Sequence, residues 1–205
     1  MRRTAVCAAA LLLAVSPAGA HLVSTGMGPV YDGMSHFLLS PPSLAPLLGL
    51  ALWTGLRGPD HGRWALFTAT GAWSCGSVLG LALAPPGVAA SLSTAAMCLI
   101  LGILAAADFE APIVLTVVLA ALIGLLDGAM SAAAAGTAAG LAAIVGSSAA
   151  VFALMALTAS SIVPLRLLWL RIAVRVTGSW LAALGLLLMG WAIRARAHLP
   201  WAAFR

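Results

Sequence analysis

The chain has 205 residues, of which 63% are hydrophobic and 7% are charged. A soluble globular domain carries about 25% charged residues, so the composition excludes that class and predicts an integral membrane protein. All ten cationic side chains are arginines, and the formal net charge is +5. They are scattered over loops and chain ends and form no basic patch, which argues against a nucleic acid as partner.

The first 20 residues have the three parts of a secretory signal peptide. Arg2 and Arg3 form the positive segment, eleven apolar residues follow at 5–15, and small residues at 18–20 form a cleavage site. Eleven apolar residues are too few to cross about 30 Å of hydrocarbon. We therefore expect removal of the leader, which leaves His21 as the mature N-terminus in the periplasm of a bacterium.

Residues 21–205 divide at their charges and prolines into six apolar stretches. Each is long enough, or nearly so, for the roughly 20 residues that a spanning helix needs. The sequence therefore predicts an all-α, polytopic transmembrane bundle of about six spans. The predicted bounds are 31–56, 64–84, 88–107, 112–126, a segment within 132–159, and 176–193.

Prolines and small residues add detail to the first two stretches. Proline breaks a helix, so Pro41 and Pro42 predict that the first span is interrupted. Residues 57–63 (RGPDHGR) are predicted to be the loop between the first two spans. On the second span, Gly76 and Gly80 belong to a ridge of small residues, which predicts close packing against another helix.

The arginines also predict an orientation, because positively charged loops stay on the cytoplasmic side of a membrane. With the mature N-terminus outside, five arginines face the cytoplasm and three face the periplasm. The cytoplasmic set is Arg57, Arg63, Arg166, Arg171 and Arg175, and the periplasmic set is Arg194, Arg196 and Arg205. We therefore expect a multi-pass protein of the bacterial inner membrane with a periplasmic N-terminus.

The three cysteines, Cys7, Cys75 and Cys98, show neither a CxxC motif nor a Cys/His spacing. No zinc or disulfide framework is therefore predicted. Cys75 and Cys98 lie inside apolar runs, where a cysteine behaves as a small buried apolar side chain.

Asp32 and His36 are the most prominent ionisable residues of the first span. They are four residues apart and therefore project from the same face of a helix. A carboxylate oxygen and an imidazole nitrogen at that spacing can share one transition-metal ion. The broken helix that follows is typical of the ion sites of transporters. A second interpretation stays open, in which the two side chains form only a hydrogen-bonded pair near the start of the helix.

Two further residues are candidate metal ligands. If the leader is cleaved, the free amine and imidazole of His21 can chelate a divalent ion and fold back over Asp32. Asp127 follows a long apolar run, and three roles stay open for it: a metal ligand, a proton relay, or a loop residue outside the membrane. His61 and His198 are interpreted as solvated residues of a loop and of the C-terminal tail.

The leader followed by histidine, the stretch YDGMSHFLLSPPSLAPLLGLALWTGLRG, and the stretch RVTGSWLAALGLLLMGW together resemble the HupE/UreJ family of bacterial membrane proteins. The resemblance implies a nickel or cobalt permease associated with the maturation of hydrogenases or urease. It also implies that Asp32 and His36 take the place of an acid–histidine motif in the first span. In this chain three residues separate the acid from the histidine, whereas the family motif has them adjacent.

The functional prediction is therefore an integral membrane permease for a divalent transition metal, nickel first and cobalt second. The predicted metal ligands are Asp32, His36, His21 and Asp127, and the partners are the lipid bilayer, the metal ion and possible maturation proteins. A non-transporting accessory protein, docked through the basic stretch 166–175, is the alternative. No nucleophile–base pair is visible, since Ser35 and His36 are adjacent and point apart on a helix, so no enzyme activity is predicted. No Walker motif is present.

Overall fold

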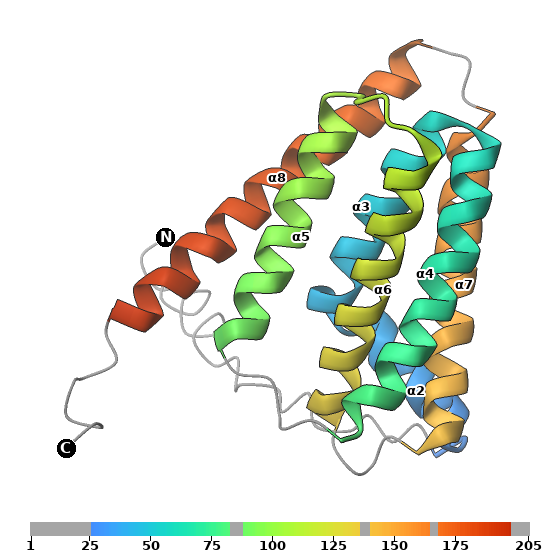
Figure 1. Ribbon diagram of the computed structural model, residues 1–205, viewed down its shortest axis with the longest axis vertical. Coiled ribbons are helices and arrows are strands. Elements are labelled where there is room, and N and C mark those ends of the chain that lie inside the picture. The colour runs from blue at the N-terminus through green and yellow to red at the C-terminus, as the bar shows by residue number, and fades with distance from the viewer. Residues whose placement is uncertain (1–25, 83–87, 136–139, 165–167, 198–205) are drawn as a thin grey trace, which may run out of the picture.

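The computed structural model describes residues 26–82, 88–135, 140–164 and 168–197, and within these ranges the chain forms α-helices and no strands. In chain order the helices are α2 (Pro29–Leu38), α3 (Pro41–Arg57), α4 (Pro59–Gly80), α5 (Val88–Ala106), α6 (Ile113–Ala135), α7 (Leu141–Ile162) and α8 (Leu168–Ala197). The all-α prediction is confirmed for this part of the chain (Figure 1). The predicted leader, His21, Arg166 and His198 lie outside the described residues.

The first predicted span is broken, as its prolines indicated. α2 ends at Leu38, α3 begins at Pro41, and the two helix axes meet at an angle of 72°. Proline lacks an N–H group and fits the first turn of a helix, where that group has no partner. Pro41 therefore ends one helix and begins the next.

The predicted loop at 57–63 is wrong. A single residue, Gly58, separates α3 from α4, and its φ of 108° is a conformation that residues with a side chain rarely adopt. The chain reverses at this glycine, and Pro59 then begins α4. Asp60, His61 and Arg63 consequently stand on the first turns of a helix and not in a loop.

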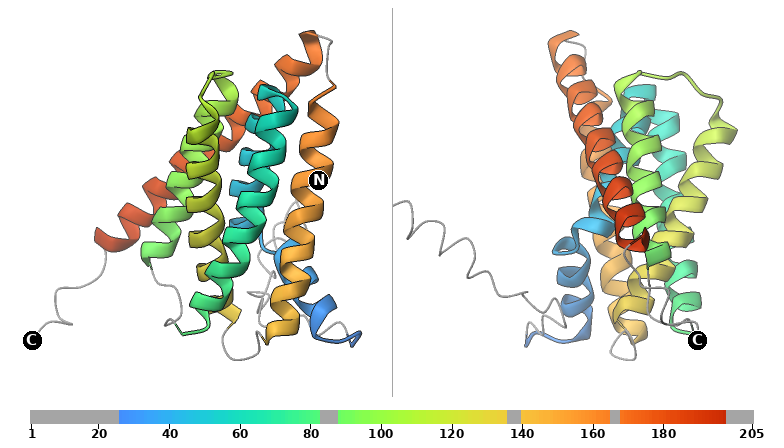
Figure 2. Two further views of the ribbon diagram at one scale, coloured as in Figure 1. Left: turned by 45° about the vertical axis from the view of Figure 1, so that its right-hand side comes forward. Right: turned by 90° about the vertical axis from the view of Figure 1, so that its left-hand side faces the viewer.

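The helices after α2 alternate in direction. α3, α5 and α7 run toward the end of the molecule drawn uppermost in Figure 1, and α4, α6 and α8 run back. The two views in Figure 2 show the same alternation. We call the end that holds Arg57 and the α5–α6 loop the upper end, and the end that holds α2 the lower end.

Three groups of helices make up the bundle. α4 packs along α6, α5 packs along α8, and α7 packs against α2, α3 and α4. α3 lies in the middle and contacts all six of the other described helices at least weakly. Its side chains Leu47, Leu50 and Trp53 are fully buried and form the centre of the core.

Small residues bring α4 and α6 together, as the predicted ridge indicated. A β-carbon added at Gly76 would overlap the backbone of Leu125, and one added at Gly80 would overlap the backbone of Ala129. α6 presents Gly124 to α4 in the same way. Because lipid gives no hydrophobic force between helices, such close backbone contact is the usual basis of their association.

Replacing Gly76 by alanine is expected to lower the free energy of unfolding by about 1–3 kcal/mol, because the new methyl group forces α4 away from α6. The matched control is Gly71→Ala on the same helix, where nothing lies within 4 Å of the added carbon. Chemical unfolding of both variants in detergent checks the prediction. Equal unfolding midpoints for the two variants would contradict it.

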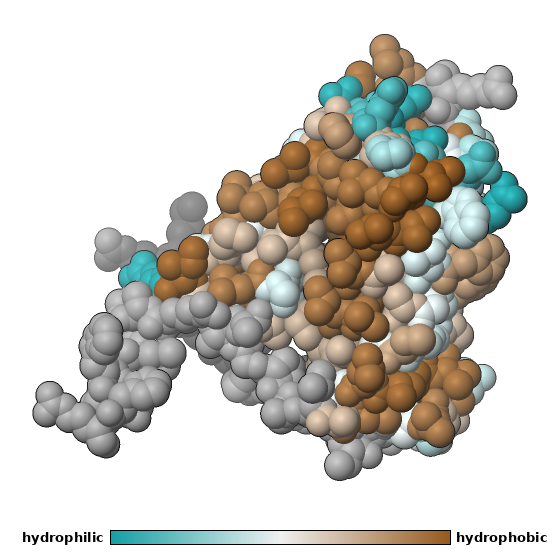
Figure 3. Space-filling view, in the orientation of Figure 1, coloured by the Kyte–Doolittle hydropathy of each residue, from teal (hydrophilic) through white to brown (hydrophobic). Residues whose placement is uncertain are grey.

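Fewer of the described helices are long and apolar enough to span a membrane than the sequence predicted. Ile113–Ala135, Leu141–Ile162 and Leu168–Arg194 are long and apolar enough to cross it, and α2 with α3 adds a fourth span if the bent pair counts as one. α4 has the length, but serine, threonine and glycine replace aliphatic residues along it, and the apolar part of α5, Ala90–Ala106, is short. Three or four spans are therefore supported by length and composition, fewer than the predicted six. Figure 3 shows apolar side chains over most of one face and hydrophilic ones at the upper end.

Candidate functional site

Asp32 and His36 both lie on α2, one turn apart and half-buried, as their spacing predicted. The helix ends two residues after His36, at the break before α3. Gly33, between them, is set against α7, because a β-carbon at this position would overlap the backbone of Ala143. This close crossing fixes α2 at the lower end of the bundle.

Asp127 is a buried residue of α6 and not a loop residue. Only 2% of its surface is exposed. The hydroxyl of Ser43 donates a hydrogen bond to its carboxyl group, while Oδ2 makes no hydrogen bond within the described part of the chain. Eight residues separate Asp127 from the last residue of α6, which places it about 12 Å from the lower end of that helix.

The break in the first span explains how Ser43 reaches Asp127. Ser43 is the third residue of α3 and is itself buried. The first turn of a helix carries a partial positive charge, which favours a nearby carboxylate. The sequence analysis missed Ser43, although its place directly after Pro41-Pro42 marks the start of a helix inside an apolar stretch.

The structure does not bring the predicted ligands together into one cluster. Among the described residues, no group of three or more His, Cys, Asp or Glu side chains is close enough to hold a metal ion. Asp32 and His36 therefore form one candidate position on α2, and Asp127 forms another inside the bundle.

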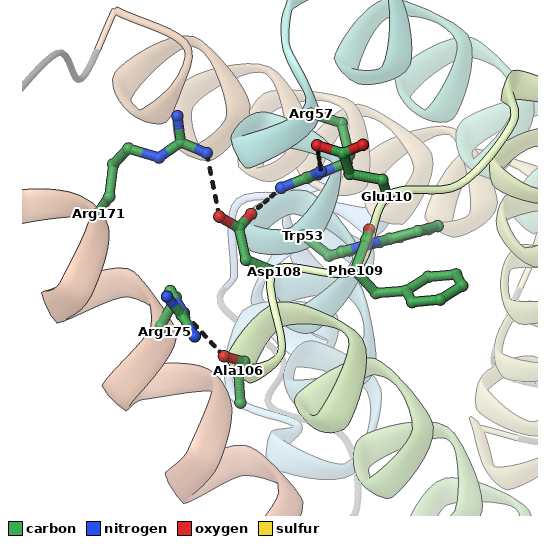
Figure 4. A network of polar contacts seen from close by, with 8 residues as sticks. All are labelled: Trp53, Arg57, Ala106, Asp108, Phe109, Glu110, Arg171 and Arg175. Carbon is green, nitrogen blue, oxygen red and sulfur yellow. Dashed lines mark hydrogen bonds and ion pairs between the residues drawn. The ribbon is translucent and has the colours of Figure 1, made fainter. Parts of the chain in front are cut away.

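A network of charged side chains occupies the upper end (Figure 4). Arg57, the last residue of α3, pairs with Asp108, and its guanidinium lies 3.8 Å from the carboxylate of Glu110. Arg171 of α8 donates to the other oxygen of Asp108 at 3.2 Å. The side chain of Arg57 is 8% exposed and that of Asp108 is 24% exposed, so the pair is largely removed from water.

The backbone at the end of α5 places Asp108 in this network. Asp108 has a φ of 52°, and its N–H bonds to the carbonyl of Ala105, while the N–H of Phe109 bonds to the carbonyl of Leu104. This pattern is a Schellman motif, and aspartate is one of the few residues besides glycine that visit its left-handed position. Trp53 also donates to the carbonyl of Phe109 at 3.1 Å, which holds the α5–α6 loop on α3.

Within the basic stretch 166–175, residues 168–175 belong to α8. Arg171 pairs with Asp108, and Nε of Arg175 donates to the carbonyl of Ala106 at 2.8 Å. Both side chains therefore bind within the chain, at the α5–α6 loop. This observation weighs against the prediction that the stretch is a free docking surface.

His61 is not a solvated loop residue, contrary to the prediction. It lies half-buried on the first turn of α4, and its Nδ1 is 2.8 Å from the hydroxyl of Thr116 on α6. Thr116 is fully buried. The pair joins α4 to α6 at the upper end, at the opposite end of the bundle from α2.

Comparisons of the chain with protein-family models, with curated proteins and with solved structures gave no significant match.

Proposed function

We propose that this chain is a permease of the HupE/UreJ type that carries a divalent transition metal, nickel first and cobalt second, across a bacterial inner membrane. The observation that carries the proposal is Asp127. A carboxylate with one oxygen unbonded and almost no exposure is costly inside a membrane unless it binds a cation or a proton. Ionisable groups within spans commonly mark ion pathways for that reason.

The alternating helix directions support six spans for the proposed permease. α3 to α8 run up and down in turn, so α4 and α5 lie beside helices that qualify as spans and run across the same thickness. α4 has 22 residues, about 33 Å at 1.5 Å per residue, which matches the hydrocarbon thickness. Gly76, Ser77 and Gly80 on α4 face α6, and Ser74 bonds to Ser148 of α7, so several of the residues that lower the hydropathy of α4 face other helices and not lipid.

The charge distribution supports a cytoplasmic upper end. Arg57, Arg63, Arg171 and Arg175 all belong to that end, and cationic groups stay on the cytoplasmic side. Asp32 and His36 then face the periplasm, where a metal ion arrives. The membrane potential would drive a divalent cation inward by about 4.6 kcal/mol per 100 mV, from about 2.3 kcal/mol for each charge.

In this proposal the ion binds first at Asp32 and His36 on α2 and then passes to Asp127. The residues between Asp127 and the upper end are packed, since Leu50 and Trp53 of α3 and Ala120 of α6 are fully buried. The described conformation is therefore closed on the proposed cytoplasmic side. Release into the cytoplasm requires α3 to separate from its neighbours there.

The test is uptake of nickel, cobalt, zinc and copper ions by purified protein in proteoliposomes. We expect saturable nickel uptake and a loss of at least about 10-fold in His36→Ala and in Asp32→Asn, because each removes one of the two ligands at the entry position. The matched control is Asp60→Asn, which removes an exposed carboxylate that pairs with Arg63. Unchanged uptake in both α2 variants would contradict a role for this position, and the absence of uptake of all four ions would contradict the permease.

A further inference from the structure

One carboxylate at the upper end joins three helices. Asp108 follows the last turn of α5, and its two oxygens bind Arg57 at the end of α3 and Arg171 in the first turn of α8 (Figure 4). Arg175 of α8 adds a hydrogen bond from its Nε to the carbonyl of Ala106, the last residue of α5, at 2.8 Å. The upper ends of α3, α5 and α8 are therefore held together around Asp108.

The same three helices meet again inside the bundle, below these ion pairs. A β-carbon added at Gly49 of α3 would overlap the side chain of Leu181 on α8 and press on that of Leu101 on α5. Cys98 lies about one turn below Leu101 and is 1% exposed. At 3.6 residues per turn it projects between Leu101, which meets α3, and Gly102, which meets α8. The thiol of Cys98 is therefore covered only while these three helices stay together.

The ion pairs at the upper end leave one buried donor without a partner. The side chain of Arg57 is largely buried, and its Nε makes no hydrogen bond within the described part of the chain. Such a group destabilises the closed arrangement, and water would satisfy it once α3 moved away. Glu110 is exposed and lies 3.8 Å from Arg57, so it offers a carboxylate that Arg57 can retain after it leaves Asp108. The closed arrangement thus competes with an open one in which Arg57 is hydrated.

We propose that Arg57, Asp108 and Arg171 form a latch that keeps the cytoplasmic exit of the permease closed, and that the exit opens when α3 moves away from the end of α5. The inference rests on the proposed permease and names the contacts that control release of its ion. A divalent cation that leaves Asp127 toward the upper end repels both arginines and attracts the carboxylate of Asp108. The transported ion therefore weakens the latch as it approaches, and the latch closes again behind it.

The experiment measures how fast a charged, water-soluble maleimide modifies Cys98 in the purified full chain in lipid nanodiscs. Cys7→Ala and Cys75→Ala are introduced first, so that Cys98 is the single thiol. We expect Arg57→Met and Asp108→Asn each to speed the modification by at least about 10-fold. Breaking a buried ion pair favours the open form, and a buried thiol reacts in proportion to the population of that form.

Two controls separate a latch from a general loss of stability. Gly76→Ala forces α4 away from α6 without touching the latch, and Arg63→Met removes an exposed ion pair at the same end of the bundle. Both should leave the rate of modification unchanged. A comparable increase in Gly76→Ala would overturn the latch, and so would an unchanged rate in both Arg57→Met and Asp108→Asn.

Nickel uptake by the same proteins in proteoliposomes separates this inference from the permease. Uptake by the parent protein, with no faster modification in the latch variants, would overturn the latch and leave the permease standing. Faster modification without uptake would retain the latch as a closure of the bundle and overturn the permease. If neither is observed, both are overturned.

Discussion

Replacing Asp127 by asparagine is expected to reduce metal uptake by at least about 100-fold while the protein stays folded. Loss of a residue that only orients a metal ligand typically costs 10–100-fold in affinity, so loss of a ligand itself should cost no less. Asparagine keeps the shape of the side chain and can still accept the hydrogen bond from Ser43, but it carries no negative charge. Uptake assays in proteoliposomes, with thermal unfolding measured on the same preparations, check this prediction.

The control for Asp127→Asn is Asp60→Asn, because Asp60 is an exposed carboxylate whose surface ion pair with Arg63 lies at the opposite end of the bundle. It should leave uptake unchanged. A folded Asp127→Asn protein with normal uptake would show that the buried carboxyl group is structural. Loss of folding in Asp127→Asn alone would show the same, since an ion ligand is not needed for the helices to pack.

Replacing Arg57 by methionine is expected to lower the free energy of unfolding by about 3 kcal/mol. Breaking a buried ion pair by removing one partner costs about 3–5 kcal/mol, because the remaining charge keeps its desolvation cost without its compensation. The lower end of that range applies because Asp108 is 24% exposed and still binds Arg171. Methionine preserves the aliphatic stem of the side chain, so the change reports mainly on the charge.

Chemical unfolding in detergent, followed by tryptophan fluorescence, measures the effect of Arg57→Met. Arg63→Met is the matched control, because Arg63 forms an exposed ion pair with Asp60, and such pairs contribute about 0–1 kcal/mol. Adding Asp108→Asn to Arg57→Met should restore part of the loss, since it removes the uncompensated carboxylate. Equal destabilisation by the two single arginine variants would contradict a special role for the Arg57–Asp108 pair.

The sequence predicted where most helices lie and where the first one breaks, because apolar runs and prolines act locally. It placed α5 within one residue of its observed bounds and identified the glycine face of α4. It failed at Gly58, because charged residues at 60 and 63 suggested a loop, whereas one glycine with positive φ completes the reversal. It also ended the fourth span at 126, whereas α6 continues to Ala135 and carries Asp127 inside the bundle.

The sequence did not predict which helices pack against one another. A membrane helix is apolar on every side, so its pattern of residues does not identify the face that meets a neighbour. The hydrogen bond between Ser43 and Asp127 joins α3 and α6, two helices that are far apart in the chain. The network of Arg57, Asp108 and Arg171 likewise depends on the Schellman motif that ends α5. Single candidate residues could be identified from the sequence, but the residues that they contact were identified only from the fold.

The pairing of α5 with α8 has a consequence for how the protein is made. About 60 residues separate the end of α5 from the start of α8, and synthesis at roughly 5–20 residues per second takes several seconds to cover them. During that time Gly102 of α5, which the finished protein sets against the backbone of α8, meets lipid or the insertion machinery instead. Asp108 likewise lacks its ion pair with Arg171 until α8 has been synthesised. A nascent chain that stops before α8 therefore exposes both a bare helix face and an incompletely paired carboxylate, the features by which membrane quality control could recognise it as unfinished.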